Sequence, residues 1–291
     1  MLSEAEISEI SEHARAIRET IIEMLVAAGS GHTAGPLGMA DIFASFYFYI
    51  LKHDPKNPDW PERDRLILSN GHIVPVRYAA MAHAGYFPVE ECLTLRKFGS
   101  RLQGHPERTK LPGLETTSGP LGSGLGQAAG IAYGARMDLP AGRQVKTTFR
   151  VYCAMSDGEQ DAGNIWESAM FAGNNKLSNL TAVIDRNNIQ INGMTEDVMP
   201  VENLRAKYEA FNWHVIEVDG HNIKQFVDAT DEAKAIYEKP TVIIAHTIPG
   251  KGIKEIEFDY TWHGKPPTKE EATKFLHELR TMQGKVVSEH Q

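Results

Sequence analysis

The chain has 291 residues, of which 42% are hydrophobic and 23% are charged, so it can bury a full core. Its formal net charge of −8 disfavours nucleic acid and anionic membranes as partners, but it leaves room for a small phosphorylated ligand. The longest apolar run, residues 42–51, is too short to span a bilayer, and the acidic N-terminus lacks an apolar signal segment. We therefore expect a cytoplasmic protein.

Residues 1–60 are predicted to form an N-terminal helical arm. Apolar residues recur at spacings of three and four from Ile7 to Leu25, which indicates one face of a long helix that ends at Gly29. A glycine-rich turn then leads into a second, very apolar helix at about residues 41–51.

From residue 65 onward, apolar runs alternate with helical patterns. The predicted strands are 65–69, 148–155, 180–185, 213–220 and 241–246, with helices that begin near Glu159, Glu202 and Lys224. Continuous β-branched runs separated by helices are typical of a parallel sheet covered on both faces. We expect one doubly wound α/β domain over residues 1–291, in which 247–291 form a C-terminal loop and helix. Ligands of such sheets bind beyond the carboxyl ends of the strands.

The two cysteines, Cys92 and Cys153, lie in apolar segments without the spacing of metal ligands. We expect both to be reduced core residues in a reducing compartment.

Polar residues follow two of the predicted strands. Taken alone, Asp157 is explained as a helix cap, and Asn187 as part of an Asx-rich turn before a hairpin. They lie about one strand–helix–strand unit apart, so neighbouring strand tips would bring a carboxylate, an amide oxygen and a backbone carbonyl together. Such hard oxygen ligands suit Mg²⁺, which takes its other oxygens from water and phosphate. The helix that begins near Glu159 would favour a diphosphate at its N-terminus.

This arrangement resembles the thiamine diphosphate enzymes, whose motif is Gly-Asp-Gly followed about thirty residues later by Asn-Asn. The resemblance narrows to transketolases because several segments follow that family's order and spacing between about residues 20 and 265. They are SGHTAGPLGMADI, RDRLILSNGH, GHPE, TTSGPLGSGLGQAAG and residues 155–193. Any one of them would be a weak signal, but all of them in register are specific. The chain is similar to the diphosphate-binding half of a transketolase.

The resemblance implies a set of site residues. Asp157, the side chain of Asn187 and the main-chain oxygen of Ile189 would hold Mg²⁺, for which Ca²⁺ or Mn²⁺ can substitute. Leu121 would contact thiamine diphosphate through its backbone near the aminopyrimidine. The cofactor-binding residues would be His72, Gly119, Pro120, Leu121, Gly158, Asn187 and His263.

Histidines in three glycine-containing loops match the family's active-site histidines. Taken singly, His32, His72 and His105 are each explained as surface or capping residues. The resemblance to transketolases implies that His72 lies nearer the diphosphate and that the other two face the sugar oxygens. Imidazoles can donate to a developing oxyanion or move protons near pH 7. His263 matches the second histidine of a late family motif and is a fourth catalytic candidate.

Some positions depart from the family pattern. Ser156 replaces the first glycine of Gly-Asp-Gly, and Ala162 stands where the family often has a glutamate, although Glu167 is kept and Asp161 is adjacent. In dimeric relatives, that acidic pair helps to connect the two active sites. In the late family motif Thr-His-x-x-His-Gly, His263 matches the second histidine. Tyr260 stands three residues earlier, where the motif has its first histidine.

The resemblance also implies a partner. The family's pyrimidine-binding domain, which activates the cofactor, would begin where this chain ends. We therefore expect the partner to be a C-terminal transketolase subunit, in a heterotetramer of two chains of each kind that acts on sugar phosphates. Alternatives are half of a 1-deoxyxylulose-5-phosphate synthase-like enzyme, a 2-oxoacid dehydrogenase α subunit, or a non-catalytic regulatory subunit. A nicotinamide site is disfavoured because Gln127 breaks the G-x-G-x-x-G pattern.

Overall fold

The computed structural model describes residues 2–137 and 149–281. Its main sheet is wholly parallel, as predicted. The strands, in spatial order, are β1 (Arg65–Leu68), β2 (Val151–Ser156), β3 (Leu180–Arg186), β7 (Thr241–His246) and β6 (His214–Asp219). A separate hairpin pairs β4 (Ile189–Gln190) with β5 (Gly193–Met194). Position 148 of the second predicted strand lies outside the described residues.

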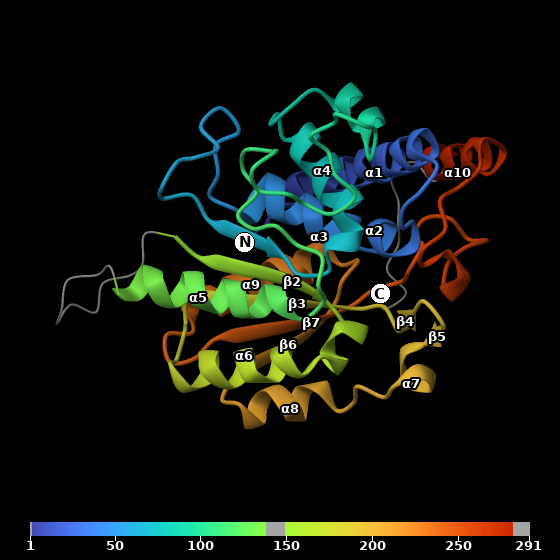
Figure 1. Cartoon of the computed structure of the whole chain (residues 1–291). Helices are drawn as coiled ribbons and strands as arrows, with labels where there is room; N and C mark the ends of the chain where they lie inside the picture. The colour runs from blue at the N-terminus through green and yellow to red at the C-terminus, as the bar shows by residue number, and fades with distance from the viewer. Residues whose placement is uncertain (1, 138–148, 282–291) are drawn as a thin grey trace.

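Helices cover both faces of this sheet, which confirms the doubly wound α/β prediction (Figure 1). One face carries α5 (Ser123–Met137), α6 (Gly163–Asn174) and α8 (Leu204–Ala210). The other carries α1 (Glu4–Ala28), α3 (Ala40–Ser45), α4 (Val74–His83) and α9 (Ile223–Ala235), with α10 (Lys269–Thr281) packed on α1. Short helices are α2 (Ala34–Gly38), η1 (Phe46–Ile50), η2 (Gly71–Ile73), η3 (Val89–Thr94), η4 (Gly158–Asp161), α7 (Thr195–Val198) and η5 (Tyr260–Trp262).

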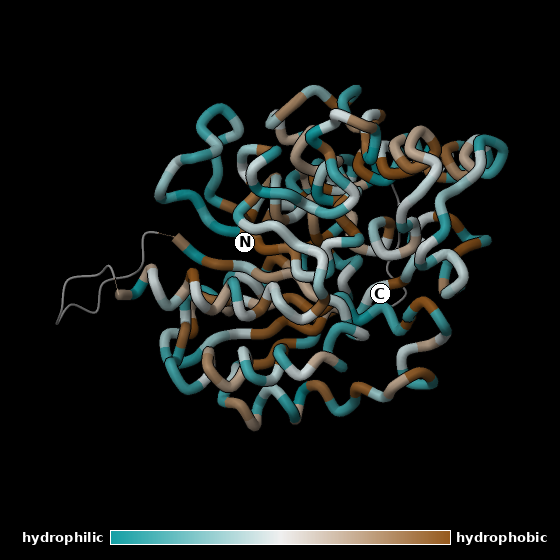
Figure 2. Tube along the Cα trace, viewed as in Figure 1, coloured by the Kyte–Doolittle hydropathy of each residue, from teal (hydrophilic) through white to brown (hydrophobic). Residues whose placement is uncertain are grey.

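The strands are buried on both sides because their side chains alternate between two apolar clusters. On β2, Tyr152 and Ala154 join the cluster under α1 and α3, whereas Cys153 joins the cluster under α5 and α6. Figure 2 shows the strands as a hydrophobic band through the middle of the molecule. Cys92 and Cys153 are both free and buried, as predicted for core residues.

The N-terminal helices are part of the same core as the sheet. Helix α1 begins with a capping box between Ser3 and Glu6 and ends at Gly29, whose φ of 63° is left-handed. The buried guanidinium of Arg18 donates to Asp41 of α3 over 2.6 Å. The expected second helix is α3, which continues as the π-helix η1.

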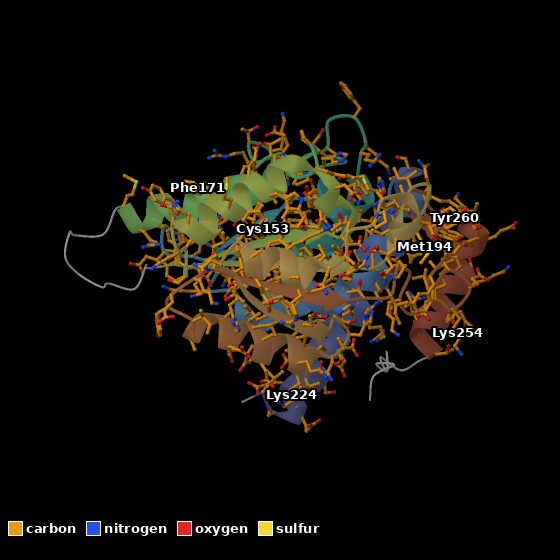
Figure 3. All side chains as sticks on the ribbon, turned by 90° about the horizontal axis from the view of Figure 1, so that it is seen from below. Cys153, Phe171, Met194, Lys224, Lys254 and Tyr260 are labelled. Atoms are coloured by element: carbon orange, nitrogen blue, oxygen red, sulfur yellow. The ribbon has the colours of Figure 1, made fainter. Side chains whose placement is uncertain are left out.

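The chain leaves two neighbouring strands toward opposite faces at the carboxyl end of the sheet. The chain leaves β3 toward α8 on one face, whereas it leaves the neighbouring β7 toward α10, which packs on α1 at the other face. Open α/β sheets bind ligands where neighbouring strands diverge in this way. Figure 3 shows Met194 of β5 and Tyr260 of η5 beside each other at this end, where the two elements are in contact. No helix in the described ranges has the length and apolar character needed to cross a membrane.

Candidate active site

A pocket of about 240 Å³ opens beyond the carboxyl ends of β1, β2 and β3. The sequence-predicted residues that line it are His32, His72, Leu121, Gly158, Asn187, Ile189 and His263. They come from loops that are far apart in the sequence and meet because parallel strands end at the same edge of the sheet. The structure thus brings seven of the predicted site residues to one pocket.

The other predicted residues lie around this pocket and do not line it. Asp157 is fully buried beneath its floor, between the lining residues Ser156 and Gly158. His105 lies in an adjacent depression of about 370 Å³ beside Arg96. Gly119 and Pro120 precede Leu121 and line neither cavity.

Three histidine rings form a cluster in the pocket. The ring centroids of His32 and His72 are 4.7 Å apart, and those of His32 and His263 are 5.4 Å apart. His72 lies 5.3 Å from His263 by the same measure. The hydroxyl of Thr33 donates to the main-chain oxygen of Lys265 over 2.6 Å, which ties the loops of His32 and His263 together.

The surroundings of these histidines favour their neutral forms. Burial, followed by the charges of His263, Arg96 and His105, lowers the pKa of His32 to about 4. Burial and the neighbouring imidazoles hold the pKa of His72 well below its usual value, and burial also lowers the pKa of His263. A neutral imidazole can donate through one ring nitrogen and accept through the other, so the cluster can move protons.

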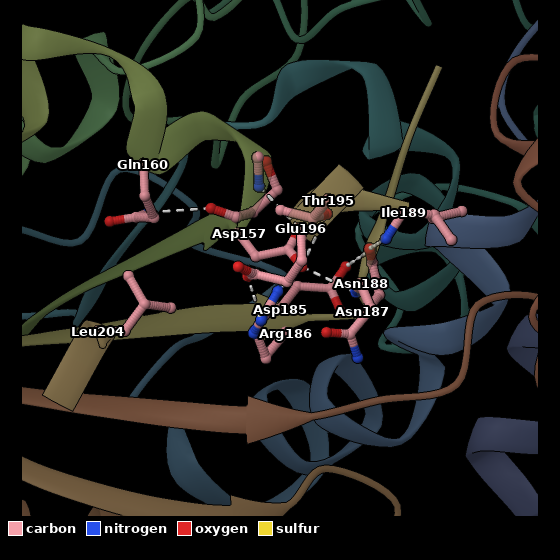
Figure 4. A network of polar contacts seen from close by, with 12 residues as sticks. Asp157, Gln160, Asp185, Arg186, Asn187, Asn188, Ile189, Thr195, Glu196 and Leu204 are labelled. Atoms are coloured by element: carbon pink, nitrogen blue, oxygen red, sulfur yellow. Dashed lines mark hydrogen bonds and ion pairs between the residues drawn. The ribbon is translucent and has the colours of Figure 1, made fainter. Parts of the chain in front are cut away.

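Beneath the pocket floor, Asp157 is held by a network of polar contacts (Figure 4). Its Oδ2 accepts bonds from Arg186 Nη1 at 2.9 Å, from the N–H of Asn188 at 2.7 Å and from Thr195 Oγ1 at 3.3 Å. Its Oδ1 accepts only the N–H of Gly158, at 2.7 Å, among the described residues. Burial nevertheless raises the pKa of Asp157.

The oxygen atoms at the tips of β2 and β3 fit a divalent cation. Oδ1 of Asp157 keeps lone pairs for a metal because a single N–H occupies it. Burial, with the nearby charge of Asp157, raises the pKa of Asp185 to about 7. Asn187 donates to Asp185 over 2.8 Å, which fixes the direction of its amide.

No group of three or more His, Cys, Asp or Glu side chains in the described ranges could hold a metal ion. The predicted ligand set contains only one residue of those types, Asp157. Its other ligands would be an amide oxygen, a main-chain oxygen and oxygens of water or phosphate, which is the coordination that Mg²⁺ favours.

Glu159 is a site residue that the sequence reasoning missed. Its buried carboxylate accepts the hydroxyl of Ser69, the N–H of Gly122 at 2.6 Å and the N–H of Ser156 at 3.0 Å. Ser69 in turn accepts the N–H of Gly124 at 3.0 Å. Glu159 thus fastens the loop that carries Leu121 to the ends of β1 and β2.

Comparison with known proteins decides the family. The model for the transketolase thiamine diphosphate binding domain matches residues 10–284. A 6-deoxy-6-sulfo-D-fructose transketolase subunit from Clostridium sp. is 41% identical, covering 92% of this chain and 95% of that protein. One of the subunits of an apulose-4-phosphate transketolase from Phocaeicola vulgatus is 36% identical over 90% of each chain. The chain belongs to the transketolase family, in its thiamine diphosphate binding domain.

The fold of the chain is also similar to that of solved transketolases. Transketolase from Campylobacter jejuni superposes with a TM-score of 0.84 at 33% sequence identity, covering 97% of this chain but only 43% of that one. The chain therefore spans less than half of a single-chain transketolase and nearly all of the two subunit relatives.

Of the positions that depart from the transketolase pattern, Ser156 lines the pocket, whereas Ala162 and Tyr260 do not. Asp161, next to Ala162, accepts a bond from Gln190 at 3.2 Å. Glu167 is exposed on α6, and Tyr260 is 40% exposed on η5.

Proposed function

We propose that this chain is the diphosphate-binding subunit of a two-chain transketolase. Assembled with a pyrimidine-domain subunit, two chains of each kind would transfer a two-carbon ketol unit from a ketose phosphate to an aldose phosphate. The observation that carries the proposal is the single pocket that combines the histidine cluster with Gly158 and Asn187 at the strand tips.

Thiamine diphosphate, when bound, supplies the carbanion chemistry of such an enzyme, so the protein's task is placement and proton management. Asp157, Asn187 and the main-chain oxygen of Ile189 would hold Mg²⁺, or Ca²⁺ or Mn²⁺ in its place. Gly158 lines the pocket and has no side chain to keep a diphosphate away from its backbone. The position favours glycine because a Cβ there would meet the side chain of Gln190 at 2.9 Å. Gly119, Pro120 and Leu121 would form the wall beside the aminopyrimidine.

The histidines would act on the sugar. A neutral His32 can donate a hydrogen bond to a substrate oxygen, and a neutral His263 can accept or return a proton within the cluster. The ring of His72 lies 4.7 Å from that of His32 and 5.3 Å from that of His263 between centroids, and its proposed role is beside the diphosphate. His105 would reach the sugar from the adjacent depression, where Arg96 adds positive charge.

An exposed apolar surface supports the proposed partner. Tyr133 and Met137 of α5 and Met170 and Phe171 of α6 are between 37% and 69% exposed. The rings of Tyr133 and Phe171 are in contact, with centroids 5.5 Å apart (Phe171 is labelled in Figure 3). Contiguous exposed apolar side chains are typical of protein interfaces. We assign this surface to the pyrimidine-domain subunit, because two relatives of nearly equal length are named as transketolase subunits.

The identity of the donor sugar can be tested directly. The relatives' names contain 6-deoxy-6-sulfo-D-fructose and apulose-4-phosphate, so both belong in a donor panel beside ketoses of the pentose phosphate pathway. The free, buried thiols of Cys92 and Cys153 fit a reducing compartment, in keeping with the expected cytoplasmic location.

The deciding experiment is to co-express the chain with pyrimidine-domain chains of its own organism. Binding of thiamine diphosphate with Mg²⁺ and ketol transfer are then measured for the complex and for each chain alone. We expect transfer only from the complex. Full activity of the isolated chain would refute the two-chain proposal. Tight cofactor binding by a complex that transfers no two-carbon unit to any aldose would instead favour a regulatory subunit. A Phe171→Asp variant should weaken assembly.

A further inference from the structure

Asn70 has a buried side chain that faces the pocket without any hydrogen-bond partner. The residue is 0% exposed and belongs to the pocket lining. Neither its Nδ2 nor its Oδ1 has a partner within residues 2–137 and 149–281. Buried amide groups are nearly always paired, and an unpaired one destabilises the folded state. An amide kept in this state at a ligand pocket indicates that the ligand completes its bonding.

The backbone around Asn70 is fixed on both sides, so the residue is held at the pocket. Its main-chain oxygen accepts the N–H of Ile73 at 3.0 Å, and Gly71 donates to Ser69 over 2.9 Å. A side chain at position 71 would meet the hydroxyl of Ser118 at 2.1 Å, so this turn has no space to rearrange. The amide is therefore preorganised before any ligand arrives.

The end of β1 brings Asn70 to the edge of the sheet that carries the proposed diphosphate site. Leu68 of β1 pairs with Ala154 of β2, and Asn70 and Ser156 each follow two residues after this pair. Ser156 lines the pocket together with Gly158, which we assigned to the diphosphate. A second polar atom in the pocket, Nδ1 of His32, is also buried without a partner in the described ranges. The pocket thus presents unused polar groups to a ligand.

We propose that Asn70 is a cofactor-binding residue whose amide nitrogen donates a hydrogen bond to an anionic oxygen of the diphosphate. This inference rests on the proposed function, because thiamine diphosphate is the ligand that the family implies. The carbonyl end of the amide can accept a bond from a water molecule that enters with the ligand. A hydrogen bond to a charged group is stronger than a neutral one, so the binding effect should exceed the effect on folding.

The inference gives opposite expectations for the free and the ligand-bound protein. Asn70→Ala removes an unpaired amide, so the melting temperature of the ligand-free chain should stay the same or rise. The dissociation constant for Mg²⁺–thiamine diphosphate, measured by calorimetry, should rise about 10- to 100-fold. Mg²⁺–pyrophosphate should lose affinity by a similar factor. Asn70→Leu keeps the branched shape without polar atoms and serves as the second variant if the alanine variant does not fold.

Asn179 provides the matched control. It is 5% exposed and lies away from the pocket. Its Nδ2 donates to the main-chain oxygen of Ala132 over 2.9 Å, whereas its Oδ1 has no partner in the described ranges. Asn179→Ala should lower the melting temperature and leave the dissociation constant unchanged.

The outcomes separate the two proposals. If the unsubstituted chain and its complex bind no thiamine diphosphate, the proposed function fails. If they bind it and the Asn70 variants bind equally well, the proposed function stands and the role of Asn70 is wrong. Weaker binding of thiamine diphosphate with unchanged binding of pyrophosphate would also overturn the assignment to the diphosphate. So would a fall in melting temperature like that of Asn179→Ala, because it would indicate a structural role.

Discussion

His32 should make the stability of the protein depend on pH. Burial, then the charges of His263, Arg96 and His105, lowers the pKa of His32 to about 4 in the folded chain, against about 6.5 when unfolded. Between these values the unfolded state binds more protons than the folded state. The unfolding free energy contributed by neutral His32 is therefore complete above about pH 6.5 and is lost as the pH falls toward 4.

The size of the effect follows from the two pKa values. Moving from about pH 7.5 to about pH 5.5 protonates most of the unfolded histidine but little of the folded one. His32 alone should then lower the unfolding free energy by about 1.4 kcal/mol. A His32→Gln variant, which cannot be protonated, should lose about that much less stability than the unsubstituted protein over the same interval.

Urea denaturation followed by tryptophan fluorescence at both pH values measures this difference. The comparison between variants matters more than the total change, because His72 and His263 also have lowered pKa values. His277→Gln, at an exposed position on α10, is the matched control. If the unsubstituted protein and His32→Gln lose equal stability between the two pH values, the proposed neutral state of His32 is wrong.

Further substitutions test the metal site and the packing. Asp157→Ala should abolish Mg²⁺-dependent binding of thiamine diphosphate in calorimetry, and unchanged affinity would reject this metal ligand. Gly173→Ala places a carbon 1.8 Å from the main-chain oxygen of Phe211, so denaturation should show a loss above about 3 kcal/mol. Gly130→Ala, in open space on α5, should instead stabilise by up to about 1 kcal/mol. Glu115→Gln, between two buried arginines, should cost about 3–5 kcal/mol.

The sheet was predictable because its strands are buried on both faces. Burial on both faces requires continuous apolar runs, and β3 and β7 coincide with predicted strands to within a residue. Helix α1 was predictable for a similar reason, since its apolar stripe and its terminal glycine are local signals. The order and spacing of the transketolase segments then predicted that His32, His72 and His263 belong to one site, although a single glycine–histidine pair carries little information.

The contacts that hold the site were not predictable, because they join residues far apart in the sequence. Nothing local in the sequence indicates that Arg186 turns back to Asp157, or that Glu159 reaches Ser69 across 90 positions. The unpaired state of Asn70 depends on where every neighbouring donor and acceptor lies, so only the folded structure reveals it.

The pocket is polar and buried at one end and apolar and exposed at the other. Its floor holds Asp185 and Asn187, which are at most 5% exposed, whereas Leu121 and Ile191 on its rim are 44% and 68% exposed. A diphosphate with its metal suits the floor, where fixed polar groups replace water. An aromatic ring at the rim would keep one side in solvent unless another surface covers it. This asymmetry is a physical reason to expect the phosphate end of the cofactor to bind this chain and the ring end to need the partner subunit.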